Sequence, residues 1–453
     1  MEQCKELNPN QKLIITTWFM FIVILSSILT FSLSVLILHF AMGLITLHFC
    51  FKTDYKTAKL WLIIFSISIL FVFLIYLANQ FYYGEPYYIG GSDDLKYEQW
   101  GRAVYNSDIY EPSEIMEHRI IGQFHNSPYF ASYIARLIQF SEFLGGYTTF
   151  LPRIANAYYL LWICMIIKYL LDKYTNLAPR TVYYSLAFFA FMPNIQYINS
   201  HVFRDTFNLL QVLLIVLLFD FLVGKNRYSI KILTIILLPL LSYYTYYTRA
   251  NSLIFAGIII LLMLSALYRV KTIYIILGLI PLLLLSNFLE VFRIKYYIET
   301  YSSYVSNIAG DGLSKFVFNR PLLPLGIFFR GMYALISPFP NFFGLFQENS
   351  KLLFDFIQLL VYLGVIMQIF AIPFIVKRAL KFDWLSLAFL SWFLAITAST
   401  FTFRHFIFYY PFMSAIAIDG FLSAEIKSRK SILFLSIFVI LCFGMIYISL
   451  KLF

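Results

Sequence analysis

The segment that follows Lys12 contains no lysine, arginine, aspartate or glutamate until Lys52. Such a run is much longer than the roughly 20 apolar residues that cross the hydrocarbon core of a bilayer. It is also far too long for a cleavable signal peptide. The segment therefore predicts two membrane-spanning helices that are joined by a tight hairpin.

Comparable apolar runs recur along the whole chain, which has 453 residues, 61% of them hydrophobic and only 13% charged. A soluble protein carries roughly 25% charged residues, so this chain has too few charges to cover a surface in water. We predict an all-α polytopic membrane protein with about 11–13 transmembrane helices in a single membrane domain, residues 1–453. The expected spans are 13–31, 33–51, 60–78, 154–171, 181–198, 206–223, 232–247, 251–268, 272–289, 352–376, 384–402, 406–422 and 431–449.

The basic residues predict the orientation of these spans. Cytoplasmic loops of membrane proteins are enriched in lysine and arginine, and most of the bases here fall in loops on one side of the expected topology. This side should face the cytoplasm together with the N-terminus, and it accounts for the net charge of +11 without nucleic-acid binding. The loops hold Lys52, Lys56, Lys59, Lys173, Arg180, Lys225, Arg227, Lys231, Arg269, Lys271, Lys377, Arg378, Lys381, Lys427, Arg429 and Lys430.

Two longer segments lie on the opposite, outer side. The segment 79–150 contains more acidic than basic residues, unlike the loops on the other side. The segment 290–350 is rich in proline, phenylalanine and glycine, which favours short interfacial helices. Because large loops on one face require an explanation, these two segments are the first places to look for a function.

The first candidate site is Gly90-Gly91-Ser92-Asp93-Asp94, soon after the third expected span. Two glycines allow a tight turn, and two adjacent carboxylates suit general-base catalysis on a sugar hydroxyl. The pair Asp93 and Asp94 could also hold Mg or Mn, although the chemistry requires no cofactor. The structural alternative is a turn that caps the helix beginning near Leu95.

The second candidate site consists of three arginines at outer helix ends: Arg204, Arg249 and Arg404. Each lies on the outer side of the expected topology, whereas the bases described above lie on the cytoplasmic side. Charges at membrane depth tend to mark function. Arginine binds phosphate through a planar, bidentate fork, so the three together suit a lipid-linked phosphate or pyrophosphate. The alternative is that each is an interfacial anchor. Three polar residues accompany them: His201, Asp205 and His405.

A third stretch begins at His125 and returns the chain to the membrane at Arg153 and Asn156. Phosphate-binding loops of nucleotide hydrolases, dinucleotide fingerprints, zinc-protease motifs and esterase serine motifs do not occur in the sequence. Nucleotide-driven transport and soluble-type hydrolysis are therefore disfavoured.

With these residues, the chain resembles the multi-span C-class membrane glycosyltransferases of bacterial envelopes. The resemblance rests on four places: Asp93-Asp94, the passage from His125 through Arg153 to Asn156, the pair Arg204-Asp205, and Arg404 with Pro411. Three spans, rather than one, precede the acidic segment, and no soluble domain follows the last span. That arrangement also fits O-antigen and capsule polymerases.

The resemblance implies a glycosyltransferase of the bacterial inner membrane, active at the periplasmic or extracellular face in lipopolysaccharide, O-antigen or capsule synthesis. Its partners would be a donor sugar on undecaprenyl or another polyprenyl (pyro)phosphate, a glycan or lipid-linked acceptor, and membrane lipid. Asp93 or Asp94 would accept the proton of the acceptor hydroxyl. Arg204, Arg249 and Arg404 would bind the leaving phosphate, with His125, Arg153, His201, Asp205 and His405 in support.

Three alternatives remain open from the sequence. A repeat-unit polymerase would use the same chemistry. A flippase of lipid-linked sugar would require basic residues along the spans, whereas the arginines singled out here lie at helix ends on one face. An accessory envelope subunit is the third alternative.

Overall fold

The computed structural model describes residues 7–88, 93–122, 127–268, 274, 317–318, 325–338, 342, 345–346, 351–399 and 402–452. This part of the chain is 84% helical and has no strand. Among the described residues, seven helices are long and apolar enough to cross a membrane: α1 (Pro9–Thr30), α2 (Leu33–Phe51), α3 (Tyr55–Tyr83), α7 (Phe150–Tyr174), α10 (Arg204–Val223), α11 (Tyr228–Arg249) and α18 (Leu352–Ala379). The protein is therefore an all-α, multi-pass membrane protein, as predicted.

Local sequence explains where the first helices begin and end. The side chain of Asn8 caps α1 in a reciprocal capping box with Gln11. Phe31 adopts the left-handed conformation and is 95% exposed, and Ser32 then caps α2. This turn is the predicted hairpin. Asp54 caps the start of α3, and Gly84 ends it with a positive φ that glycine adopts without strain.

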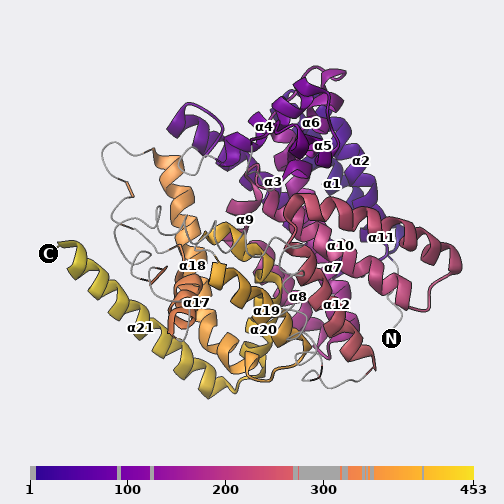
Figure 1. The fold of residues 1–453 in the computed structure, drawn as a ribbon. Helices are drawn as coiled ribbons and strands as arrows, with labels where there is room; N and C mark the ends of the chain where they lie inside the picture. Colours follow the sequence, from indigo (N-terminus) through magenta and orange to yellow (C-terminus); the bar gives the residue numbers. More distant parts are fainter. Residues whose placement is uncertain are drawn as a thin grey trace.

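Three shorter helices form the acidic segment after α3: α4 (Asp93–Ser107), α5 (Pro112–Glu117) and α6 (Pro128–Glu142). Figure 1 shows them gathered at one end of the molecule. Gly101 allows α4 to approach α6 closely, because a Cβ at this position would lie 2.3 Å from Cγ2 of Ile134. The acidic segment 79–150 therefore contains short helices rather than a further span.

Helices α7 and α10 form the centre of the bundle. In α7, 78% of the most apolar window is buried inside the protein, compared with 11% in α11. α7 packs against α2, α3, α8 (Pro179–Phe191) and α10, and α10 also packs against α11 and α12 (Ser252–Tyr268). Side chains on α7 and at the start of α10 are consequently surrounded by other helices rather than by lipid.

One expected span, 181–198, is divided in two. Pro193 cannot donate a backbone hydrogen bond, and Met192 is extended, so α8 ends at Phe191 and α9 (Pro193–Asn199) begins anew. The expected span 406–422 likewise starts with the short 3₁₀ helix η4 (Phe403–Phe408), and α20 (Tyr410–Ser423) follows with Pro411 in its first turn. The two short helices α9 and η4 contact each other; the predicted residue His201 follows α9, and Arg404 lies in η4.

The remaining described helices are α17 (Ile327–Ile336), α19 (Trp384–Ser399) and α21 (Ile426–Leu452). α17 is a short apolar helix inside the second expected outer segment, 290–350, most of which lies outside the described residues. The expected span 272–289 also lies almost wholly outside them. In Figure 1, α21 runs along the edge of the molecule, and it contacts α18.

Candidate functional site

Asp94, in the first turn of α4, is fully buried and holds several elements together. One carboxylate oxygen accepts a hydrogen bond from the backbone N–H of Val202 at 2.5 Å. The other accepts from the backbone N–H of Tyr88 at 3.1 Å and from Nη2 of Arg153 at 3.2 Å. Both oxygens therefore bind donors from distant parts of the chain, and we call Asp94, Arg153, Tyr88 and Val202 the Asp94 clamp.

The segment between α9 and α10, residues 200–203, is buried although it is not helical. Its carbonyl groups need partners, because unsatisfied backbone polar groups are costly inside a protein or membrane. α7 supplies these partners: Arg153 donates to the carbonyl of Ser200, and Asn156 donates to the carbonyls of His201 and Phe203. Arg153 also donates to the carbonyl of Pro86. The passage from Arg153 to Asn156 thus fixes the segment that leads into α10.

The three predicted arginines converge at the end of the bundle that holds α4. Arg204 opens α10, Arg249 ends α11, and Arg404 lies in η4. Nη1 of Arg249 lies 3.6 Å from one oxygen of Asp205, and Nε of Arg404 lies 3.7 Å from the other. We call Arg204, Asp205, Arg249, Arg404 and His405 the arginine cluster.

His405 completes this cluster. Its Nε2 lies 3.8 Å from Asp205, and its side chain is only 2% exposed. Burial lowers the pKa of His405 well below its ordinary value, and the positive charges of Arg249, Arg404 and Arg204 lower it further. The charges of Arg204 and Arg404, which are far apart in the sequence, therefore both lower the pKa of the same imidazole.

Asp93 reaches the cluster from α4. Its carboxylate lies 2.5 Å from Nη2 of Arg404, and its side chain is 33% exposed, in contrast to fully buried Asp94. The two neighbouring aspartates consequently have different environments. Asp94 is enclosed by the clamp, whereas Asp93 is accessible at the edge of the arginine cluster.

Tyr97, one helical turn after Asp93, was not singled out by the sequence. The guanidinium group of Arg204 lies 5.9 Å from the centre of its ring. Burial raises the pKa of Tyr97 to about 12, and the charges of Arg204, Asp93, Arg404 and Asp205 also act on this hydroxyl. Its spacing of four residues from Asp93, on the same face of a helix, is the signal that could have found it.

The supporting residues fall into two groups. Arg153 belongs to the clamp, and Asp205 and His405 belong to the arginine cluster. His201 is also buried: its Nδ1 contacts the carbonyl of Tyr197 at 2.7 Å, and its ring stacks on Phe203. Burial lowers the pKa of His201 to about 4. His125 lies outside the described residues.

In the part of the chain that the structure describes, the geometry does not suit a metal at the aspartate pair. Both oxygens of Asp94 already face N–H donors, and Asp93 contacts a guanidinium group. Hard divalent cations need several oxygen ligands in one place, and no group of three or more histidine, cysteine, aspartate or glutamate side chains that could hold a metal occurs among the described residues. The described partners of Asp93 and Asp94 are therefore N–H donors and a guanidinium group.

Cavities elsewhere in the described structure include one on each side of the bundle's first helices. The larger, ≈ 550 Å³, lies between the start of α3, the end of α7 and the start of α8. The other, ≈ 450 Å³, lies between the α1–α2 turn and residues 143–148. Neither is lined by the arginine cluster. Within that cluster Arg204 and Arg249 are buried, so Asp93 and Arg404 are the groups through which a ligand would first contact it.

Comparison with known proteins adds no family to this description. No family model matches the chain, and neither a curated protein nor a solved structure is significantly similar to it.

Proposed function

We propose that the protein is a membrane glycosyltransferase that uses a polyprenyl-(pyro)phosphate-linked sugar donor at the face of the bilayer that holds α4. The observation that supports this proposal is the convergence of Arg204, Arg249 and Arg404 around Asp205 and His405, with Asp93 at the edge. Among the described residues, three guanidinium groups meet two carboxylates there. An anion of the donor would contact these guanidinium groups through charge-assisted hydrogen bonds.

The arginine cluster suits a lipid-linked phosphate for reasons of geometry as well. Guanidinium groups bind phosphate oxygens through paired hydrogen bonds. Arg204 begins α10 and Arg249 ends α11; in this proposal, these helix ends lie at the level of the lipid headgroups. The contacts of Arg249 and Arg404 to Asp205 are 3.6 and 3.7 Å long, which is longer than an ordinary hydrogen bond.

In the proposed reaction, the hydroxyl of the acceptor attacks the anomeric carbon of the donor sugar. Its proton passes to the carboxylate of Asp93. The bond between the anomeric carbon and the phosphate oxygen breaks, and its electron pair stays on the leaving phosphate. The arginines stabilise this growing negative charge, as preorganised cations do in other enzymes. One displacement of this kind inverts the configuration at the anomeric carbon.

The two aspartates have separate roles in this proposal. Asp93 is partly exposed and contacts Arg404, so it can reach an acceptor beside the bound phosphate. Asp94 keeps α4 in register with the start of α10 through Val202 and Arg153. Asp93 is therefore the proposed base, and Asp94 is a positioning residue.

The experiment that tests this proposal measures sugar transfer from synthetic polyprenyl-phosphate sugars by the purified protein. Arg204→Ala, Arg249→Ala and Arg404→Ala should each reduce kcat/KM for the donor by roughly 100-fold, the usual cost of removing one charge-stabilising group. Arg136→Ala is the matched control, because Arg136 is an exposed arginine on α6 at the same end of the molecule. A normal response to the donor in all three variants would refute the proposed phosphate binding.

The same proposal covers two biological outcomes that differ in product. In a strain that lacks the protein, loss of one side residue from an envelope glycan would identify a transferase of single sugars. Glycans that stop after one repeat unit would identify a polymerase. A build-up of unflipped lipid-linked sugar, with transfer unaffected, would support the flippase alternative instead.

A further inference from the structure

The larger cavity lies at the opposite end of the bundle from the arginine cluster. α3, α7 and α10 each run from one end to the other, and the cavity is formed by the start of α3, the end of α7 and the start of α8. Its volume of ≈ 550 Å³ is within the range of about 300–1,000 Å³ that small-molecule sites occupy. The proposed glycosyltransferase reaction makes no use of it.

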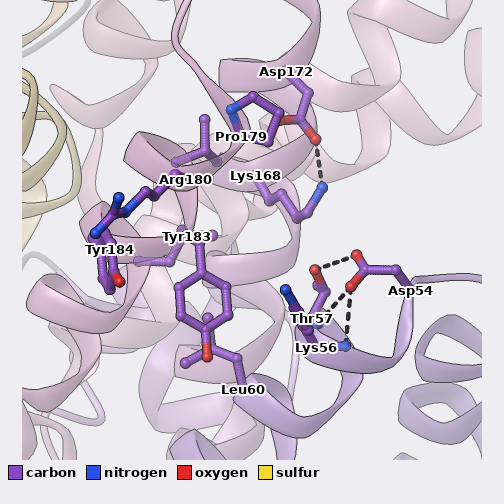
Figure 2. A pocket seen from close by; sticks show the side chains of 12 residues that line it. Asp54, Lys56, Thr57, Leu60, Lys168, Asp172, Pro179, Arg180, Tyr183 and Tyr184 are labelled. Carbon is purple, nitrogen blue, oxygen red and sulfur yellow. Dashed lines mark hydrogen bonds and ion pairs between the residues drawn. The ribbon is translucent and has the colours of Figure 1, made fainter. Parts of the chain in front are cut away.

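The side chains around this cavity divide into an apolar wall and a charged rim. Leu60, Val182 and Leu186 form the wall together with the ring of Tyr183. The rim carries three cationic side chains, one from each helix: Lys56, Lys168 and Arg180. Figure 2 shows Lys168 and Asp172 of α7 beside Lys56 and Thr57 of α3, with Arg180 and Tyr184 of α8 to one side.

The two carboxylates of the rim are already bound within the protein. Asp54 accepts hydrogen bonds from the backbone and hydroxyl of Thr57 and from the backbone of Lys56, which caps α3. Asp172 forms an ion pair with Lys168 at 2.5 Å. Lys56 and Arg180 have no carboxylate partner among the described residues; the guanidinium group of Arg180 lies 5.4 Å from the ring centre of Tyr184. The rim therefore favours an anion.

The start of α8 adds to this preference. The residue before the helix is Ala178, which provides no side-chain cap, and Pro179 occupies the first turn. The first backbone N–H groups of a helix carry partial positive charge and favour a negative ligand. Arg180 itself lies in this first turn.

The cavity also lies where the spans enter the bilayer. The charged residues Lys56 and Arg180 directly precede the apolar stretches of α3 and α8, and the wall residue Leu60 begins the expected span 60–78. A ligand with a phosphate at the rim would therefore place an attached acyl chain against the apolar wall and in the membrane. Basic pockets between transmembrane helices bind anionic lipid headgroups in this way.

We propose that the cavity formed by α3, α7 and α8 is a binding site for an anionic phospholipid, whose phosphate contacts Lys56, Lys168 and Arg180. The phosphate is the chemistry that the site recognises, and the apolar wall assigns it to a lipid rather than to a free ion. This proposal is independent of the glycosyltransferase activity, because it uses none of the same residues.

The test uses the purified full chain in lipid nanodiscs that contain phosphatidylglycerol, and native mass spectrometry to measure the retained phospholipid. A triple variant, Lys56→Gln, Lys168→Gln and Arg180→Gln, should retain phosphatidylglycerol about tenfold less well, because each base near the surface contributes to binding. The matched control removes three exposed bases at the same end but outside the cavity: Lys52→Gln, Lys225→Gln and Arg227→Gln. Equal retention by the triple variant and the control would overturn the proposal.

Two further measurements keep the proposal testable if the triple variant does not fold. The single variant Arg180→Gln alters an exposed side chain, and it should weaken retention of phosphatidylglycerol on its own. In the unmodified protein, photoreactive phosphatidylglycerol should cross-link to residues 54–60 or 179–186; cross-links confined to other segments would contradict the site. If inorganic phosphate stabilised the protein in phosphatidylcholine discs as strongly as phosphatidylglycerol does, the cavity would bind a soluble anion and the lipid assignment would be wrong.

Discussion

The neighbouring aspartates of α4 should respond in opposite ways to the same substitution. In Asp94→Asn, the carboxylate that accepts hydrogen bonds from Val202, Tyr88 and Arg153 becomes a neutral amide. One amide oxygen can still accept a hydrogen bond, but the amide nitrogen is a donor and would face other donors. The fully buried guanidinium group of Arg153 would also lose its counter-charge.

The expected cost follows from this geometry. Removing one partner of a buried ion pair destabilises a protein by about 3–5 kcal/mol, because the other charge stays buried without compensation. Asp93, by contrast, is 33% exposed and forms a single ion pair with Arg404. Its replacement by asparagine should change the free energy of unfolding by no more than about 1 kcal/mol. It should nevertheless lower sugar transfer by about 10²–10⁴-fold, the usual contribution of a general base.

The assay compares denaturant unfolding in detergent and donor turnover for the two variants. Asp108→Asn is the control, since Asp108 is exposed and has a positive φ that asparagine tolerates; it should change neither quantity. An Asp94→Asn protein with the stability of the wild type would refute the clamp. Full turnover by Asp93→Asn would refute its role as base, whatever the result for Asp94.

Two other predictions concern pH and topology. The pKa of His405 is lowered in the folded protein by burial and by three arginines, so the unfolded chain binds this proton at higher pH than the folded chain. The contribution of His405 to the free energy of unfolding should be complete above about pH 6.5 and should decrease as the pH falls, by at most about 1.4 kcal/mol per pH unit. His405→Gln should remove this slope, whereas His118→Gln, at an exposed position, should leave it unchanged; an identical pH profile in His405→Gln would contradict the proposed electrostatics. Reporter fusions after residue 110 should be active outside the cytoplasm and those after residue 227 inside, and the reverse pattern would put the arginine cluster on the cytoplasmic face.

Hydropathy and charge were sufficient to predict the class of fold. The hairpin of α1 and α2 was visible because an uncharged segment far exceeded the length of one span. The division of the span 181–198 was missed, because Pro193 lies in a stretch whose average hydropathy is that of a continuous helix. A proline can kink a membrane helix or end it, and the neighbouring helices decide which occurs.

The sequence pointed to the residues of the candidate site, but it did not show how their environments differ. Successive spans run in opposite directions, so the expected topology put Arg204, Arg249 and Arg404 at the same end of the bundle. The structure brings these three residues together. Sequence could not distinguish Asp93 from Asp94, because both are acidic and adjacent. Their difference depends on the packing of α4 against the buried segment before α10. The same packing brings Tyr97 to Arg204, and the only signal in the sequence for this contact was the four-residue spacing of Tyr97 from Asp93.

The central claim is that the arginine cluster binds the phosphate of a polyprenyl-linked donor. The most direct measurement is a cryo-electron-microscopy structure of the protein with undecaprenyl phosphate. The claim predicts density for the phosphate within hydrogen-bond distance of at least two of the guanidinium groups of Arg204, Arg249 and Arg404, beside the carboxylate of Asp93. Phosphate density at a different place, with the arginine cluster unchanged and empty, would contradict it.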